Sequence, residues 1–183
     1  MTEKYFISAN ELLIDSYKLA RKIIDSNFKP NFIVALWRGG TPVGSALQEF
    51  LKYHNVQTDH IAIRTSSYEG IDRQNKEIKV HGLEYIEKHA NSDDKLLIVD
   101  DVYDTGLSIN AVLQSLKTTM RANMPKDIRI ATVYYKPTRN KTNHIPEFYI
   151  HETDKWLVFP HELEGLTHDE IALKGSEIKE LLK

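Results

Sequence analysis

The chain has 183 residues, of which 27% are charged and none is cysteine. This length fits one domain with a sizeable hydrophobic core, and the lack of cysteine excludes disulfides and thiolate chemistry. A net charge of −2, from 24 basic and 26 acidic residues, argues against a nucleic acid or a membrane as a partner. No apolar run reaches the roughly 20 residues of a membrane span, and no signal-peptide pattern opens the chain, so we expect a cytoplasmic protein.

The first half of the chain predicts alternating helices and strands. A capping box at Ser8 and Glu11 opens an amphipathic helix over 9–26, and a short apolar strand over 32–36 follows. Thr41 and Pro42 predict the next helix, with the threonine as cap and the proline at the first helical position. A strand over 61–65 precedes the polar stretch 66–76, which we interpret as a long mobile loop, with a solvated hairpin tip as an equal alternative.

The second half continues in the same way. We predict a returning strand over 77–80, a short helix over 82–89, and a strand over 96–99 whose unbroken apolar run is typical of a buried parallel sheet. A helix of about four turns from residue 109 and a strand over 128–135 follow. Short edge strands at 148–150 and 156–159 come next, and a capping box at Thr167 and Glu170 opens a final helix over about 168–182.

The stretch from Lys95 to Ser108, KLLIVDDVYDTGLS, gives the strongest functional signal. Its strand ends in the carboxylates Asp100 and Asp101, and a turn of small residues over 104–108 leads into a helix. In open α/β sheets, ligands bind where strand carboxyl ends meet helix amino ends. The turn can hold a phosphate, and the two acids can bind vicinal hydroxyls or a divalent cation. The alternative is an ordinary strand–turn–helix whose acids face solvent.

A second strand, over 32–36, ends in Trp37, Arg38, Gly39 and Gly40. Glycines let the backbone approach an anion, and arginine offers a bidentate charge to phosphate oxygens. Taken alone this is a weak signal, because glycine pairs open many helices for packing reasons.

The 95–108 stretch resembles the phosphoribosyl-pyrophosphate (PRPP) signature of type I phosphoribosyltransferases: an apolar strand, two acids, two apolar residues and D-T-G-x-[ST]. The resemblance covers about residues 8–163 and is closest to the purine branch, in particular the bacterial xanthine–guanine enzymes. It implies one α/β domain of the type I phosphoribosyltransferase fold, with a mainly parallel sheet flanked by helices. The implied core is about 30–137, and a small hood is formed by about 1–12 and 145–165.

The same resemblance implies the ligand contacts of the strand ends. It implies Mg²⁺ as cofactor, with Asp101 as the main protein contact and Asp100 beside it. Arg38 and Gly39 correspond to the pyrophosphate loop, where a cis peptide bond between Trp37 and Arg38 is expected. The residues implied for the ribose and the 5′-phosphate are Asp100, Asp101, Asp104, Thr105, Gly106, Leu107 and Ser108.

The polar stretch 66–76 resembles the flexible loop that closes over PRPP. Its opening residues are Ser66, Ser67 and Tyr68, and Arg73 and Lys76 are the candidates to reach pyrophosphate. Closure of such a loop excludes water from an oxocarbenium-like state.

Four residues are implied for the base and for catalysis. Lys136 resembles the lysine that donates to O6 of a 6-oxopurine, with a surface lysine as the alternative. Trp156, followed by Leu157, resembles the stacking platform, and stacking is worth roughly 1–3 kcal/mol per base; a core tryptophan is the alternative. Asp104 is implied as the catalytic group that accepts the N7 proton or stabilises charge at C1′, and a helix N-cap is its alternative.

Together these resemblances imply a purine-salvage phosphoribosyltransferase. It would transfer the phosphoribosyl group of PRPP to N9 of xanthine, guanine or hypoxanthine, release pyrophosphate, and form a homo-oligomer, a dimer or a tetramer. A PRPP-binding regulator without turnover and an enzyme for another base, such as a pyrimidine, are the alternatives. Departures from the pattern concern base preference and subunit contacts. The mobile loop differs in sequence, about ten extra residues precede the strand over 96–99, Trp37 is bulkier than usual, and His161-Glu162 stands where Trp and an acid are expected.

Overall fold

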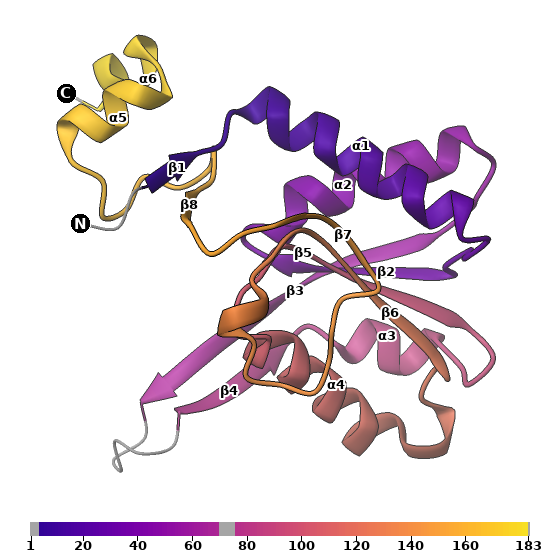
Figure 1. Cartoon of the computed structure of the whole chain (residues 1–183). Coiled ribbons are helices and arrows are strands. Elements are labelled where there is room, and N and C mark those ends of the chain that lie inside the picture. Colours follow the sequence, from indigo (N-terminus) through magenta and orange to yellow (C-terminus); the bar gives the residue numbers. More distant parts are fainter. Residues whose placement is uncertain (1–3, 70–75, 183) are drawn as a thin grey trace.

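A computed structural model describes residues 4–69 and 76–182 (Figure 1). Its central sheet consists of β2 (Phe32–Trp37), β3 (Asp59–Glu69), β4 (Lys76–His81), β5 (Lys95–Tyr103), β6 (Asp127–Tyr135) and β7 (Phe148–Glu152). The strand order is β4-β3-β2-β5-β6-β7, and only the β3–β4 pair is antiparallel. The predicted α/β fold with a mainly parallel sheet is confirmed.

Helices cover both faces of this sheet (Figure 1). Helices α1 (Ala9–Asp25) and α2 (Gly40–Tyr53) pack on one face, and α3 (Glu84–His89) and α4 (Leu107–Met120) pack on the other. Because successive strand residues point to opposite faces, Leu97 and Val99 of β5 enter the core under α1 and α2, whereas Leu96 and Ile98 enter the other core. The unbroken apolar run in the sequence follows from this two-sided burial.

A smaller unit lies at the carboxyl edge of the sheet, where β1 (Lys4–Phe6) and β8 (Trp156–Val158) pair in parallel. Helices α5 (His168–Lys174) and α6 (Ser176–Leu181) lie beside this pair (Figure 1). We call β1, β8 and the turn to residue 162 the hood. The predicted hood ranges were too wide, because α1 begins at Ala9 and β7 is a strand of the central sheet.

Two predicted boundaries were wrong. Strand β5 continues through the acid pair to Tyr103 instead of ending at Val99, because it stays paired with β6 up to that residue. Helix α2 starts at Gly40 with Gly39 as its cap, so Thr41 is not the cap; its hydroxyl donates to the Arg38 carbonyl at 2.7 Å instead.

The described ends of the polar stretch 66–76 belong to a pair of strands. Strand β3 runs to Glu69, β4 begins at Lys76, and the two pair in antiparallel register. The mobile-loop prediction was therefore wrong for 66–69 and 76, and the hairpin alternative was correct there. Residues 70–75 lie outside the described residues.

The final helix was predicted as one piece, and this was wrong. Thr167 and Glu170 do form the predicted capping box, but α5 ends at Lys174. Gly175, with φ of +145°, turns the chain before α6. An L-residue rarely adopts that backbone conformation, so glycine makes the break possible.

Candidate active site

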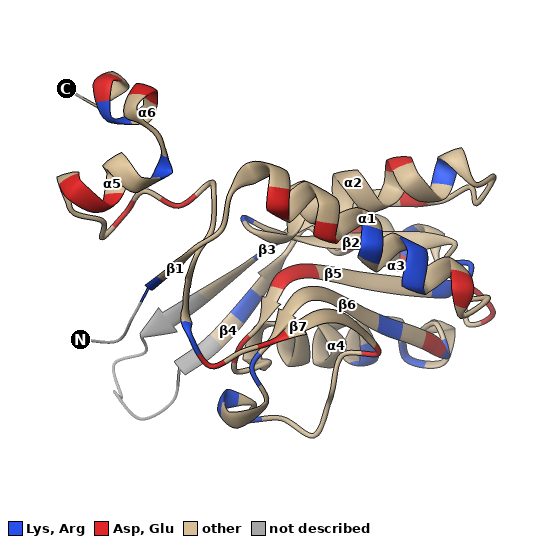
Figure 2. Ribbon diagram, turned by 45° about the horizontal axis from the view of Figure 1, so that its top comes forward, with Lys and Arg blue, Asp and Glu red and all other residues tan. Residues whose placement is uncertain are grey.

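Strands β2, β5 and β6 are neighbours in the sheet, and all three end at the same edge. The acids Asp100 and Asp101 lie in the last part of β5, Arg38 and Gly39 follow β2, and Lys136 follows β6. Figure 2 shows the acidic part of β5 in red at this edge. Side chains that are up to about 100 residues apart in sequence are therefore brought together by parallel strand pairing.

The two acids lie in different surroundings. Asp101 is buried, and its Oδ1 accepts a hydrogen bond from the backbone N–H of Val102 at 2.8 Å. Asp100 accepts a hydrogen bond from the backbone N–H of Asp101 at 3.0 Å. Burial, followed by the charge of Asp101, raises the pKa of Asp100 well above its usual range. A ligand that supplies positive charge or hydrogen-bond donors here relieves this repulsion.

The glycine loop packs directly on the acids. A Cβ on Gly39 would lie 1.9 Å from Asp101 Oδ2, and a Cβ on Gly40 would lie 2.5 Å from the Val99 carbonyl oxygen. No side chain fits at either position without displacing its neighbour. The peptide bond between Trp37 and Arg38 is cis, as predicted. The loop after β2 and the acids of β5 thus form one continuous surface.

The turn 104–108 caps helix α4 and lines a small cavity of about 80 Å³. Gly106 is the N-cap residue, with φ of +75°, and a Cβ there would lie 2.4 Å from the buried Tyr103 hydroxyl. Asp104 is therefore not the N-cap, and that alternative was wrong. The cavity is also lined by Asp100, Thr105 and Ser108. The amino end of a helix of this length favours an anion such as phosphate.

Lys136 and Asp104 approach each other at this edge. Lys136 is only 5% exposed, so the surface-lysine alternative was wrong. Its Nζ lies 3.5 Å from Asp104 Oδ2, and its backbone N–H donates to the Tyr103 carbonyl at 2.9 Å. A buried ammonium needs a carboxylate partner or a carbonyl acceptor.

Two residues that the sequence reasoning did not select join this group. Arg139 Nε lies 2.7 Å from Asp104 Oδ1, and His161 Nε2 lies 3.4 Å from Asp101 Oδ2. The signal for Arg139 was a second cation three residues after Lys136. His161 was noted only as a departure from the expected aromatic residue, and nothing in the sequence indicated its contact with an acid some 60 residues earlier.

Trp156 and Leu157 are placed differently by their strand. Trp156 is 56% exposed, so the core-tryptophan alternative was wrong, and it lines a cavity of about 280 Å³ together with Arg38 and Glu162. The Leu157 side chain is buried in the core under α1 and α2, which leaves its backbone for ligand contact. Lys136 is not among the described residues that line this cavity.

The predicted loop residues lie on the hairpin. Ser66, Ser67 and Tyr68 belong to β3, and Lys76 is the first residue of β4. Arg73 lies outside the described residues. The closing role of this segment stays a prediction.

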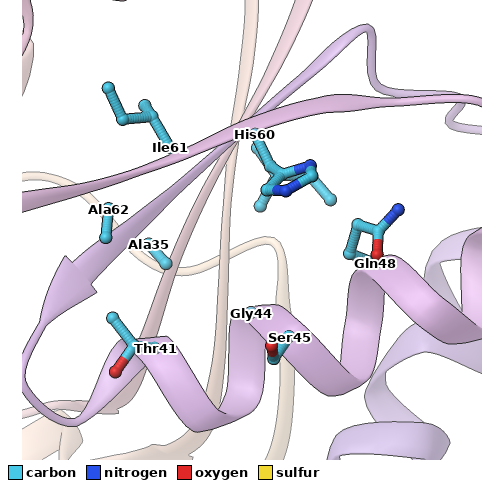
Figure 3. Close-up of a pocket in the computed structure, with 9 residues that line it drawn as sticks. Ala35, Thr41, Gly44, Ser45, Gln48, His60, Ile61 and Ala62 are labelled. Carbon is cyan, nitrogen blue, oxygen red and sulfur yellow. The ribbon is translucent and has the colours of Figure 1, made fainter.

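A separate cavity of about 160 Å³ lies between α2 and strands β2 and β3 (Figure 3). Its lining includes Thr41, Gln48 and His60 and contains neither the acid pair nor the turn 104–108. This part of the molecule is distinct from the strand-end site.

Among the residues that the structure describes, no three histidine, aspartate or glutamate side chains are placed to hold a metal ion. Asp100 and Asp101 offer oxygen ligands, and Mg²⁺ typically uses one or two carboxylates together with substrate phosphates. The pair therefore fits a cation that arrives with an anionic substrate. In the same described ranges, no helix is long and apolar enough to cross a membrane.

The family model of the phosphoribosyl transferase domain matches residues 7–165 of this chain. Hypoxanthine-guanine phosphoribosyltransferases of Sus scrofa and Homo sapiens are each 28% identical over 165 residues, covering 85% of this chain and 72% of their own length.

Solved structures show the same architecture. A purine phosphoribosyltransferase from Pyrococcus horikoshii Ot3 superposes with a TM-score of 0.71 and 26% identity, covering 90% of this chain and 97% of that one. A hypothetical protein from Neisseria gonorrhoeae with bound ppGpp gives a TM-score of 0.75 with 21% identity, covering 95% and 97%. The xanthine-guanine-hypoxanthine phosphoribosyltransferase of Helicobacter pylori gives 0.62 with 20% identity, covering 87% and 92%.

Proposed function

Because the chain belongs to the phosphoribosyl transferase domain family, we propose that it transfers the phosphoribosyl group of PRPP to N9 of a 6-oxopurine and releases pyrophosphate. The observation that carries the purine assignment is the approach of buried Lys136 to Asp104, 3.5 Å apart beside the turn 104–108. A 6-oxopurine offers an acceptor at O6 and a titratable nitrogen at N7, which match an ammonium and a carboxylate. The relatives named for hypoxanthine, guanine and purine support the same substrate class.

Each part of PRPP has a matching surface. The amino end of α4 and the hydroxyls of Thr105 and Ser108 receive the 5′-phosphate. Asp100 and Asp101 accept hydrogen bonds from the ribose hydroxyls. Arg38 and the backbone of Gly39 bind the pyrophosphate, where the absence of a side chain on Gly39 allows close approach.

We further propose that Mg²⁺ accompanies the substrate, held on the protein side by Asp101 with Asp100 beside it. When bound, the ion neutralises charge on the pyrophosphate leaving group. Its positive charge would also offset the repulsion between the two neighbouring carboxylates, which helps to raise the pKa of Asp100.

The purine enters between the turn and the hood. Lys136 donates to O6, and Asp104 accepts the proton from N7 or stabilises positive charge at C1′ as the C1′–N9 bond forms and the bond to pyrophosphate breaks. The exposed ring of Trp156 offers a face for stacking. The β3–β4 hairpin is the segment proposed to exclude water during the transfer.

We propose that the protein works as a homo-oligomer, either a dimer or a tetramer. Large apolar side chains are exposed on the outer surface of α1 and α2, and Tyr53 is the most open at 83%. Burial of such side chains against a second copy is favourable. Light scattering against the monomer mass of 21.1 kDa measures the assembly. The other large apolar side chains exposed on this surface are Leu13, Ile14 and Tyr17 of α1.

The test is pyrophosphate release from PRPP and Mg²⁺ with each purine and pyrimidine base in turn. We expect turnover with at least one of xanthine, guanine and hypoxanthine. Asp104→Asn should lower kcat by about 10²- to 10⁴-fold, the usual contribution of a general acid or base. Asp127→Asn changes a partly exposed carboxylate at the amino end of β6, the end of the strand away from the site; it is the matched control and should keep full activity.

Two other results would revise the proposal. Turnover with pyrimidines alone would contradict the roles of Lys136 and Trp156. Tight PRPP binding with no turnover on any base would favour a PRPP-binding regulator instead.

A further inference from the structure

The catalytic candidate Asp104 has two cationic neighbours, and the nearer one has no role in the proposed reaction. Arg139 Nε lies 2.7 Å from Oδ1, whereas Lys136 Nζ lies 3.5 Å from Oδ2. The two cations thus address different oxygens of one carboxylate. Arg139 can therefore stay in contact with Oδ1 while Oδ2 contacts another group.

Arg139 is fixed by a short turn that contacts several parts of the site. It ends a 3-10 helix, Pro137–Arg139, and its backbone N–H donates to the Lys136 carbonyl at 3.1 Å. The Thr138 hydroxyl donates to Asp154, which precedes the hood strand of Trp156. Just beyond the turn, the backbone N–H of Lys141 donates to the Thr105 carbonyl at 3.0 Å. The backbone that carries Arg139 is therefore anchored to both the phosphate turn and the hood.

Binding of the base changes the balance of charges around Asp104. In the proposed complex the ammonium of buried Lys136 turns to O6, so the contact at Oδ2 is released for the base. A carboxylate with no other partner would then be free to rotate. Arginine remains charged, so its attraction for Oδ1 persists when the lysine turns away. Arg139 is thus suited to hold Oδ1 while Oδ2 faces N7.

We infer that Arg139 is a positioning residue: it orients Asp104 toward the purine during transfer. This inference rests on the proposed function. Arg139 acts through Asp104 and contacts neither the base nor the reacting atoms. A direct contact of its half-exposed side chain with the phosphates of PRPP is the competing role.

The test is a double-mutant cycle measured by steady-state kinetics. Arg139→Met keeps the length of the side chain and removes its charge and donors. We expect it to lower kcat by about 10- to 100-fold, as small misplacements of catalytic groups do, with the KM for PRPP little changed. Arg139→Lys keeps the charge and should recover part of the loss. In the Asp104→Asn background, Arg139→Met should have almost no further effect, because the group it orients is gone.

Controls separate positioning from folding. Arg21→Met removes another arginine–aspartate pair, with Asp25 on α1, and should leave the kinetics unchanged. Urea unfolding of each variant measures stability, and Arg139→Lys serves as the second variant if Arg139→Met unfolds.

Two results would overturn the inference while the proposed function stands. One is additive losses in the cycle, and the other is a raised KM for PRPP with unchanged kcat, which would assign Arg139 to the phosphates. Absence of turnover in the unmodified protein with every base would overturn the proposed function itself.

Discussion

Gly39 shows how a single residue determines the shape of the site. Its Cα lies so close to Asp101 that a methyl group would overlap the carboxylate, at 1.9 Å from Oδ2. The overlapping atom belongs to a buried side chain, which has little space to move.

We expect Gly39→Ala to weaken PRPP binding by about 10-fold or more, because the carboxylate and the pyrophosphate surface are both displaced. Isothermal titration with PRPP and Mg²⁺ measures the affinity. The urea midpoint should fall only modestly, since the change lies at the edge of the sheet. Unchanged PRPP affinity would show that this loop does not form the binding surface.

At the scale of elements, helix α1 is tied to edge strand β7 through Asp15. The buried Asp15 carboxylate lies 2.7 Å from His151 Nε2 on β7 and 2.8 Å from Lys18 Nζ within α1. Burial by itself raises the pKa of Asp15, but the hydrogen bonds from Lys18 and His151 outweigh it and hold the pKa below the ordinary value of 3.8. A lowered pKa means that the charged form stabilises the fold.

This contribution should be present above about pH 3.8 and should be lost as the pH falls through the lower value in the folded protein. Asp15→Asn should reduce the free energy of unfolding by about 1–3 kcal/mol at pH 5, and the difference from the unmodified protein should shrink toward pH 2.5. Urea unfolding at several pH values between these two measures the free energy of unfolding of the variant and of the unmodified protein.

Asp25→Asn is the matched control for Asp15→Asn, because its partner Arg21 is equally close but both side chains are exposed. It should cost about 0–1 kcal/mol. Equal losses from the two variants would contradict a special role for the α1–β7 contact.

At the scale of the whole molecule, the proposed PRPP site draws on three neighbouring strands, so ligand binding should stabilise the entire sheet. PRPP at about 100 times its Kd, with Mg²⁺, should add about 2.7 kcal/mol to the free energy of unfolding. For a chain of this size, that corresponds to a rise in Tm of about 5–11 °C. Thermal unfolding with and without PRPP measures the rise in Tm, which should be smaller in Gly39→Ala. No shift at any PRPP concentration would contradict the site.

Much of the architecture could be read from local patterns. The run over 96–99 indicated a buried parallel strand because both of its faces are covered. The capping boxes at Ser8 and Thr167 marked true helix starts, since the reciprocal hydrogen bonds join residues only three apart. The start of α2 was missed because it is decided by packing of Gly40 on β5, a contact between distant segments.

The sequence by itself determined the family, the alternation of strands and helices, and the candidate residues at the strand ends, because these depend on short motifs and on periodicity. The tertiary structure decided which distant groups meet. It paired Asp104 with Arg139 and Lys136, brought His161 to Asp101, and placed the side chain of Leu157 in the core while leaving that of Trp156 exposed. Such contacts depend on strand order and register, which bring residues far apart in the chain to one edge of the sheet, and no local pattern encodes them.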